Sequence, residues 1–272
     1  VISKANVDNL KTLFENTSLA VENANYLVIK GDAGSGKSIL IEEILKNTIL
    51  KKGYFLRGKQ DQIQQNIPYF GISQILKKYT NLLLSESPNT QKRIKDKLIE
   101  ALDDNAGIIT LLAPEMELIL GKQSTPSTLE GSEAENRFNV IILNLIKVMA
   151  NISSPLVIIL DDLQWADTGT INLVKKIINE KFIPGLLFIL SFRNKEEQNS
   201  EAFLGLIEYL DSVEHIEQLE LSNLTKIDIA AFLKDTIGEN TNQFHSLVEF
   251  IFITTHGNPF FIKELLRELY SN

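Results

Sequence analysis

The stretch YLVIKGDAGSGKSILIEEIL, residues 26–45, constrains the fold more than any other part of the chain. From Gly31 to Ser38 the residues fit the spacing G-x-x-x-x-G-K-[ST], in which glycines, a lysine and a serine interrupt an apolar pattern. Residues 26–30 are apolar and partly β-branched, as a buried strand requires, and the apolar residues after Ser38 recur at helical spacing. A strand, a glycine-rich loop and a helix in this order predict a phosphate-binding P-loop. The alternative is a glycine-rich turn that caps an ordinary helix.

The residue types of this loop suit a nucleotide polyphosphate. Glycines let the backbone wrap closely around phosphates, and the positive end of the following helix dipole favours negative charge. Lys37 would reach the β- and γ-phosphates, and the Ser38 hydroxyl would ligate the Mg²⁺ that accompanies the nucleotide. We therefore predict ATP or ADP with Mg²⁺ as cofactors, bound by the loop residues Gly31, Asp32, Ala33, Gly34, Ser35, Gly36, Lys37, Ser38 and Ile39.

A second candidate group follows another apolar run, in LVIILDDLQWAD at 156–167. Two adjacent carboxylates at the end of a buried strand are costly unless a positive charge neutralises them, and Mg²⁺ could supply that charge. Asp161 would hold the metal through a water molecule, and Asp162 would orient or deprotonate the attacking water. The alternative is an Asp-rich turn that ends the strand. Asp167 precedes a helical pattern and is interpreted as a helix N-cap rather than a catalyst.

Strand and helix patterns alternate along the chain, which predicts an α/β fold with a parallel sheet and helices on both faces. About a hundred residues without a strand pattern separate the second and third strands, which is long for a crossover connection. We interpret them as a helical insert with a polar loop at 121–132. We expect strands at 26–30, 53–57, 155–160, 185–192 and 216–221, and helices after the P-loop and at 70–84, 88–103, 135–151, 168–180, 199–211, 225–237, 242–254 and 259–270. The expected domains are a P-loop core over 1–222, with the insert and loop at 58–131, and a helical region over 223–272.

The net charge and the absence of cysteine argue against some classes of function. The 272 residues include 27 Lys and Arg against 35 Asp and Glu, a net charge of −8, which argues against a surface that coats nucleic acid. Without cysteine the chain has no disulfide and no thiolate metal site, as in proteins of the reducing cytoplasm. No apolar run is long enough to span a bilayer. The chain lacks an initiator methionine and stops after a helical pattern, so we expect it to be part of a longer protein.

Four segments together resemble one class of P-loop ATPases. GDAGSGKS (31–38), IILDDLQWAD (158–167), FILSFRNKE (188–196) and GNPFFIKELLREL (257–269) look like segments of STAND-class ATPases, the signal-transduction ATPases with numerous domains. The chain is similar in particular to the AAA-like ATPase modules of large multidomain bacterial sensor kinases, serine/threonine kinases and LuxR-type regulators. GKQDQIQQNIPYFGISQIL (58–76) and LLAPEMELILGKQ (111–123) extend the resemblance over almost the whole chain. One departure is that VISKANVDNL, at the start, lacks the arginine of the segment that such modules place beside adenine.

The resemblance implies a P-loop NTPase three-layer sandwich with strand order 5-1-4-3-2 and a small helical lid after the core. Arg193 would then lie near the γ-phosphate as a sensor of nucleotide state; its alternative role is a surface arginine that ends a strand. Pro259 would open a lid helix against the base, although the sequence alone shows only a turn that enters a helix. The predicted catalytic residues are therefore Lys37, Asp162 and Arg193, the metal ligands are Ser38 and Asp161, and Pro259 joins the nucleotide contacts.

The leading interpretation is a regulatory ATPase that binds ATP, hydrolyses it slowly and changes state with its nucleotide. Its partners would be flanking signalling domains of the same polypeptide, with nucleotide-dependent self-association and without direct binding of nucleic acid. None of the arginines Arg57, Arg93, Arg137 and Arg267 has a sequence context that identifies it as a source of transition-state charge, which favours slow turnover in isolation. Two alternatives stay open: a replication-initiator-like AAA+ ATPase that acts on nucleic acid, and a nucleotide-binding scaffold that never hydrolyses.

Overall fold

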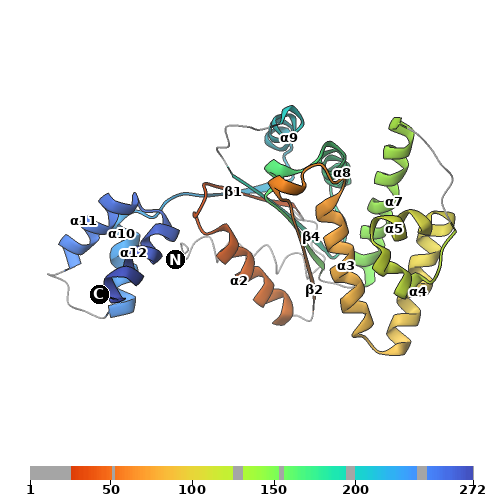
Figure 1. Ribbon diagram of the computed structural model, residues 1–272, viewed down its shortest axis with the longest axis horizontal. Helices are drawn as coiled ribbons and strands as arrows, with labels where there is room; N and C mark the ends of the chain where they lie inside the picture. The colour runs from red at the N-terminus through yellow and green to blue at the C-terminus, as the bar shows by residue number, and fades with distance from the viewer. Residues whose placement is uncertain are drawn as a thin grey trace.

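Five parallel strands form the centre of the protein in its computed structural model, which describes residues 26–50, 53–124, 131–152, 156–193, 200–237 and 244–271 (Figure 1). The strands are β1 (Tyr26–Gly31), β2 (Tyr54–Lys59), β3 (Leu156–Asp161), β4 (Leu186–Phe192) and β5 (Ile216–Leu221). Their order in the sheet is β2-β3-β4-β1-β5, which confirms the expected order 5-1-4-3-2 read from the other edge. Because β1 pairs with both β4 and β5, the P-loop leaves the interior of the sheet rather than an edge.

Side chains of the strands alternate between two apolar cores, one on each face of the sheet. On β1, Tyr26 and Val28 join one core, and Leu27 and Ile29 join the other. Figure 1 shows α2 on one side of the sheet and α8 and α9 on the other. The covering helices are α2 (Lys37–Leu50) on one face, and α3 (Phe70–Leu84), α7 (Gly131–Ile152), α8 (Thr168–Asn179) and α9 (Glu201–Ser212) on the other. This arrangement confirms the three-layer α/β sandwich, and it explains why the interior strands β1, β3 and β4 are mostly apolar, whereas the edge strands β2 and β5 carry charged residues.

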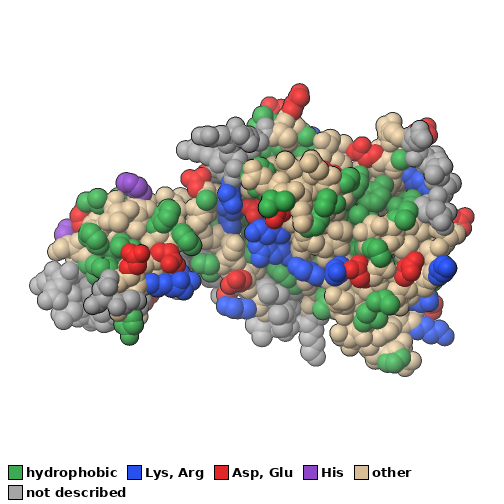
Figure 2. All heavy atoms as spheres, viewed as in Figure 1, with side chains coloured by type: hydrophobic (Ala, Val, Ile, Leu, Met, Phe, Trp, Pro, Cys, Tyr) green, Lys and Arg blue, Asp and Glu red, His purple; other side chains and the backbone are tan. Residues whose placement is uncertain are grey.

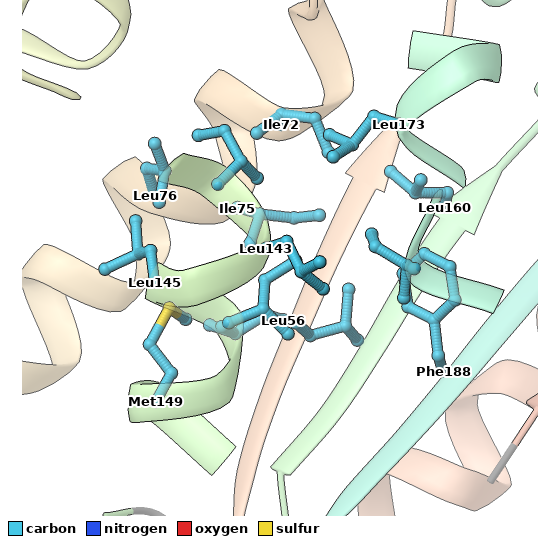
Figure 3. Close-up of a cluster of buried hydrophobic side chains, with 14 of the residues drawn as sticks. Leu56, Ile72, Ile75, Leu76, Leu143, Leu145, Met149, Leu160, Leu173 and Phe188 are labelled. Carbon is cyan, nitrogen blue, oxygen red and sulfur yellow. The ribbon is translucent and has the colours of Figure 1, made fainter. Parts of the chain in front are cut away.

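The segment between β2 and β3 is helical, as expected. After α3 come α4 (Pro88–Leu102), α5 (Ala106–Leu112) and α6 (Glu117–Leu120), and α7 leads back to β3. Figure 3 shows side chains of α3 and α7 packed toward those of β2, β3 and β4. The sequence patterns predict no helix between 103 and 121, yet α5 and α6 form there because Ile109 and Leu120 are buried in the core. Pro114 lies between α5 and α6. Because proline has no backbone N–H, a single continuous helix through this position would lack one backbone hydrogen bond.

A pair of glycines brings β2 and α3 into close contact. A Cβ atom on Gly58 would lie 2.1 Å from the carbonyl oxygen of Gly71 and 2.7 Å from its carbonyl carbon. Both obstacles are backbone atoms, so a change of side-chain rotamer cannot relieve the overlap. The insert can therefore pack this closely on the sheet only with glycine at 58, one residue before the strand ends at Lys59.

The last three helices form a small bundle with an apolar core of its own, at the left of Figure 1. They are α10 (Lys226–Ile237), α11 (Phe244–Thr255) and α12 (Pro259–Ser271), and we call them the lid. Gly257 has φ +76°, and a Cβ atom there would lie 2.0 Å from the carbonyl oxygen of Leu224. Leu224 N–H in turn donates to the Gly257 carbonyl oxygen at 2.8 Å, so the start of α12 is tied to the segment before α10. The domain boundary at 222 stays a prediction.

None of the helices in the described ranges is long and apolar enough to cross a membrane.

Candidate functional site

A cavity of 330 Å³ lies where the P-loop, the Asp pair and the lid meet. The predicted residues that line it are Ala33, Gly34, Ser35, Gly36, Lys37, Ser38, Ile39, Asp161, Asp162, Arg193 and Pro259. Three further residues, Lys59, Phe260 and Lys263, also line it. Figure 2 shows Lys and Arg side chains gathered over the centre of the molecule, between the lid and the insert. The structure therefore joins residues from distant parts of the sequence around one space with cationic walls.

The P-loop folds around the side chain of Lys37, which is 9% exposed. Lys37 Nζ donates hydrogen bonds to the carbonyl oxygens of Gly31 at 2.5 Å and Asp32 at 2.9 Å, and these two predicted residues are not among those that line the cavity. Gly34 and Gly36 have φ of +78° and +100°, which glycine adopts without strain. Burial lowers the pKa of Lys37, and nearby carboxylates partly oppose that shift. Because both carbonyl partners are neutral, a phosphate would offer the ammonium group a stronger partner.

Asp161 lies at the end of β3 and is 4% exposed. One carboxylate oxygen, Oδ1, accepts hydrogen bonds from the Ser191 hydroxyl and from the backbone N–H of Asp162. The other, Oδ2, accepts from Nε of Arg57 at 3.1 Å and from the Nη2 of the same guanidinium. Asp161 is thus held by both neighbours of its strand, since Arg57 belongs to β2 and Ser191 to β4.

Asp162 faces the cavity from a left-handed backbone conformation, φ 57° and ψ 44°. Such a conformation is uncommon for residues other than glycine, Asn and Asp, and it often marks functional sites. The carboxylate forms ion pairs with Lys59 Nζ at 3.4 Å and with Arg193 Nε at 3.8 Å, and it accepts a hydrogen bond from Gln164 Nε2 at 3.2 Å. Gln164 Oε1 also accepts from the backbone N–H of Arg193 at 3.3 Å. Arg193 therefore lines the cavity just after β4, and both its predicted nearness to the γ-phosphate and its sensor role stay predictions.

The lid contacts the P-loop through the first turn of α12. Asn258 Nδ2 donates to the carbonyl oxygen of Ala33 at 2.9 Å, and its Oδ1 accepts from the backbone N–H of Phe260 at 3.0 Å. The same Phe260 N–H lies 3.3 Å from the carbonyl oxygen of Gly34. A Cβ atom on Gly34 would lie 2.6 Å from Asn258 Oδ1, so the P-loop and α12 are in close contact. Pro259 lines the cavity beside this contact, and its predicted role against the base remains untested.

The sequence patterns assign no role to Arg57, Lys59, Asn258 or Lys263, although all four lie in or beside this site. Arg57 and Lys59 are two residues apart near the carboxyl end of β2, so they point to one face of the sheet at the edge where the P-loop lies. Two cations at alternate positions near the end of a strand are a sequence pattern that could have indicated their place in this site. The contact between Asn258 and Ala33 joins residues 225 positions apart, and no local pattern indicates it.

The arrangement fits a nucleotide better than it fits a metal ion. The cavity, Lys37 and the surrounding cations suit a polyphosphate, and Ser38 lines the same space. An ionised carboxylate has about four lone-pair sites, and four protein donors already occupy those of Asp161. No group of three or more His, Cys, Asp or Glu side chains in the described ranges could hold a metal. In this conformation Asp161 therefore does not fit the predicted role of metal ligand.

A family model described as "AAA ATPase domain" matches residues 2–189. A relative, "Hybrid signal transduction histidine kinase G" of Dictyostelium discoideum, is 35% identical over 153 residues, which are 56% of this chain and 4% of that protein. "Histidine protein kinase 1" of Candida albicans is 20% identical over 246 residues, 85% of this chain and 9% of that protein. The chain thus spans less than a tenth of the length of these relatives.

The chain is also similar, at low identity, to solved structures. AMPPCP-bound DnaA from Aquifex aeolicus is 14% identical with a TM-score of 0.47, over 97% of this chain and 59% of that one. Drosophila ORC bound to DNA is 12% identical with a TM-score of 0.42, over 94% of this chain and 52% of that one. The expectation that this chain does not bind nucleic acid directly stays a prediction.

Proposed function

The chain belongs to the AAA ATPase domain family, and on that premise we propose that it is a nucleotide-dependent switch that binds ATP and ADP and hydrolyses ATP slowly. The observation that carries this proposal is the contact between the P-loop and the lid. Ala33 and Gly34, in the loop that would hold the phosphates, accept hydrogen bonds from Asn258 and Phe260 at the start of α12. A conformational change of the P-loop would therefore alter the hydrogen bonds that hold the start of α12 against the core.

Nucleotide binding can move the lid only if the nucleotide binds the two lid positions with different affinity. Two features supply such a difference. The lid residues Pro259, Phe260 and Lys263 line the cavity, so they would contact a bound nucleotide in one lid position and lose that contact in another. Lys37 would exchange its bonds to loop carbonyl groups for bonds to phosphate, and those carbonyl groups belong to the loop that holds Asn258.

Slow turnover is consistent with the surroundings of Asp162, the candidate base. The Asp162 carboxylate forms ion pairs with Lys59 and Arg193, so an attacking water would have to compete with both cations for its oxygens. The γ-phosphate of ATP would compete for the same two cations. We propose that Asp162 becomes an effective base only after this exchange, which ties hydrolysis to the presence of the γ-phosphate.

The proposed setting is a larger signalling protein. The support is that the two relatives are named as histidine kinases and are much longer than the matched segment. We propose flanking domains of the same polypeptide as partners, with self-association that depends on the nucleotide. Mg²⁺ is proposed as the ion that accompanies ATP, with Ser38 as its ligand from the P-loop.

The test combines calorimetry, hydrogen exchange and phosphate release on the chain of 272 residues. ATP and ADP should both bind, and Lys37→Ala should weaken binding about tenfold or more, since a charge-assisted contact is lost. Bound nucleotide should change the exchange rate of the Phe260 amide, and turnover by dilute protein should stay below about one per second.

The possible results separate the candidate functions. Binding without any change at Phe260 would favour a scaffold, and rapid turnover by dilute monomer would favour a constitutive ATPase. Strong stimulation of turnover by DNA or RNA would favour an ATPase that acts on nucleic acid. Equal affinity of the parent and Lys37→Ala would show that the P-loop is not the site.

A further inference from the structure

Arg57 is the cation that neutralises Asp161. Asp161 is almost fully buried, and a buried carboxylate needs a positive partner with hydrogen bonds to its remaining lone pairs. Arg57 supplies the charge through two donors to one oxygen, while Ser191 and the Asp162 amide satisfy the other. No further acceptor site on Asp161 is left for a metal ion or for its water.

The position of Arg57 is itself fixed by the fold. Arg57 lies on β2, directly beside Asp161's strand, and pairs in register with Ile159. Its carbonyl oxygen accepts a hydrogen bond from Lys78 Nζ at 2.6 Å, which links it to α3. Its side chain is 25% exposed, so the ion pair with Asp161 is partly shielded from water. A metal ion that used Asp161 would have to displace this guanidinium.

Arg57 also changes the charge that a nucleotide meets. Without it, the cavity wall would present two carboxylates, Asp161 and Asp162, to the phosphates. Such like charges repel strongly in a partly desolvated site, and a divalent cation would be needed between them. With Arg57 in place, the charge of Asp161 is compensated inside the protein. Lys37, Lys59, Arg193 and Lys263 also line the cavity, where Lys59 and Arg193 form ion pairs with Asp162.

We propose that Arg57 is a positioning residue that takes the place of Mg²⁺ as the partner of Asp161, so that the site binds ADP almost independently of Mg²⁺. This rests on the proposed function, because it concerns the nucleotide at the same site. The ADP state is then held by protein cations alone. Asp161 becomes available to a metal only when the guanidinium of Arg57 moves away.

The experiment measures the dissociation constant of ADP with excess Mg²⁺ and with EDTA. For the parent chain the two values should agree within about threefold, a difference well below one hydrogen bond to a charged group. For Arg57→Gln, ADP should bind about tenfold or more weakly in EDTA, and Mg²⁺ should restore the affinity. Arg57→Lys should keep most of the independence, because it retains the positive charge.

Two controls separate charge from packing. Arg93→Gln removes an exposed arginine on α4 and should behave as the parent. Ser191→Ala removes a neutral donor to Asp161 and should leave ADP binding independent of Mg²⁺, since Arg57 remains. Thermal unfolding followed by the fluorescence of Trp165 reports whether each variant folds.

The parent measurement alone can overturn the proposal, whether or not the variants fold. If EDTA weakens ADP binding to the parent tenfold or more, Asp161 depends on the metal and not on Arg57. The proposal also fails if folded Arg57→Gln binds ADP equally well in both conditions. If the parent binds no ADP in either condition, the nucleotide function itself is wrong and this inference falls with it.

Discussion

Asn258→Ala should weaken the contact between the lid and the P-loop without changing any residue that would hold the phosphates. The asparagine side chain makes hydrogen bonds of two kinds. Its Nδ2 donates to the Ala33 carbonyl oxygen at 2.9 Å, across the contact between lid and core. Its Oδ1 accepts from the Phe260 N–H at 3.0 Å, which caps the first turn of α12. Alanine removes both.

The expected cost follows from these two bonds. A buried hydrogen bond between neutral groups contributes about 0.5–1.5 kcal/mol net. Loss of an N-cap costs about 0.5–2 kcal/mol, typically about 1 kcal/mol. Together they amount to about 1–3.5 kcal/mol, and at 1.4 kcal/mol per factor of ten the closed lid should become about 5- to 300-fold less favoured. Because lid residues line the cavity, release of ADP should accelerate by up to the same factor.

Asn258→Asp distinguishes the two contacts. A carboxylate still caps α12, but it has no N–H to donate to Ala33. ADP release should therefore accelerate in Asn258→Asp, while the α12 amides keep their protection in hydrogen exchange. In Asn258→Ala both should change. Asn81→Ala, an exposed site on α3, serves as the control.

The assay is stopped-flow displacement of a fluorescent ADP analogue, together with hydrogen exchange read at Phe260 and at the P-loop. The reasoning would be refuted if both Asn258 variants released ADP at the parental rate. It would also be refuted if ADP release accelerated equally in the Asn81 control.

Further predictions concern the catalytic groups, the pH response and the core. Asp162→Asn should keep ADP affinity within about threefold and lower ATP turnover about 10²- to 10⁴-fold, the usual contribution of a general base, as steady-state phosphate release would show. Arg193→Met should weaken ATP about tenfold more than ADP in calorimetry, because only ATP offers the γ-phosphate charge; equal losses would assign this arginine to the surface. Burial lowers the Lys37 pKa, and a bound phosphate would raise it again, so ADP binding should take up a proton at alkaline pH below the usual lysine value of 10.5 and weaken as pH rises. Calorimetry in buffers of different ionisation heat measures that proton; a binding heat that does not depend on the buffer contradicts it. Gly58→Ala should lower the free energy of unfolding by about 1–3 kcal/mol or more, because its Cβ meets the Gly71 backbone, and an unchanged urea midpoint would disprove the overlap.

The layers could be predicted because they depend on local sequence patterns. The strand order could be predicted from the resemblance to STAND-class ATPases. Each strand of the sheet interior contains an apolar run of four or five residues, and the helical patterns are long, so their positions agree with expectation within a few residues. The two short helices α5 and α6 lack such a stripe. Their residues become helical by packing into the insert, and propensity over so few residues is a weak signal.

The residues of the candidate site likewise fall into a group that the sequence reveals and a group that it does not. Lys37, Ser38 and Asp162 stand at the ends of strands or in the loop, where type and spacing reveal the chemistry. Arg57 and Asn258 act through partners that lie 104 and 225 positions away in the sequence. Such contacts exist only after the sheet and the lid have assembled, and a single sequence carries no direct record of them.

The placement of β1 has a consequence for the order in which the chain can fold during synthesis. β1 is made before both of its neighbours in the sheet, β4 and β5, which lie near positions 188 and 216. Parallel strands of such high sequence separation pair late, and ribosomes add about 5–20 residues per second, so the P-loop strand must wait on the order of ten seconds or more for its partners. During that interval the apolar strand has no sheet to join and depends on being kept from other chains. A nascent chain that stops before β4 is therefore expected to expose this strand and to bind no nucleotide.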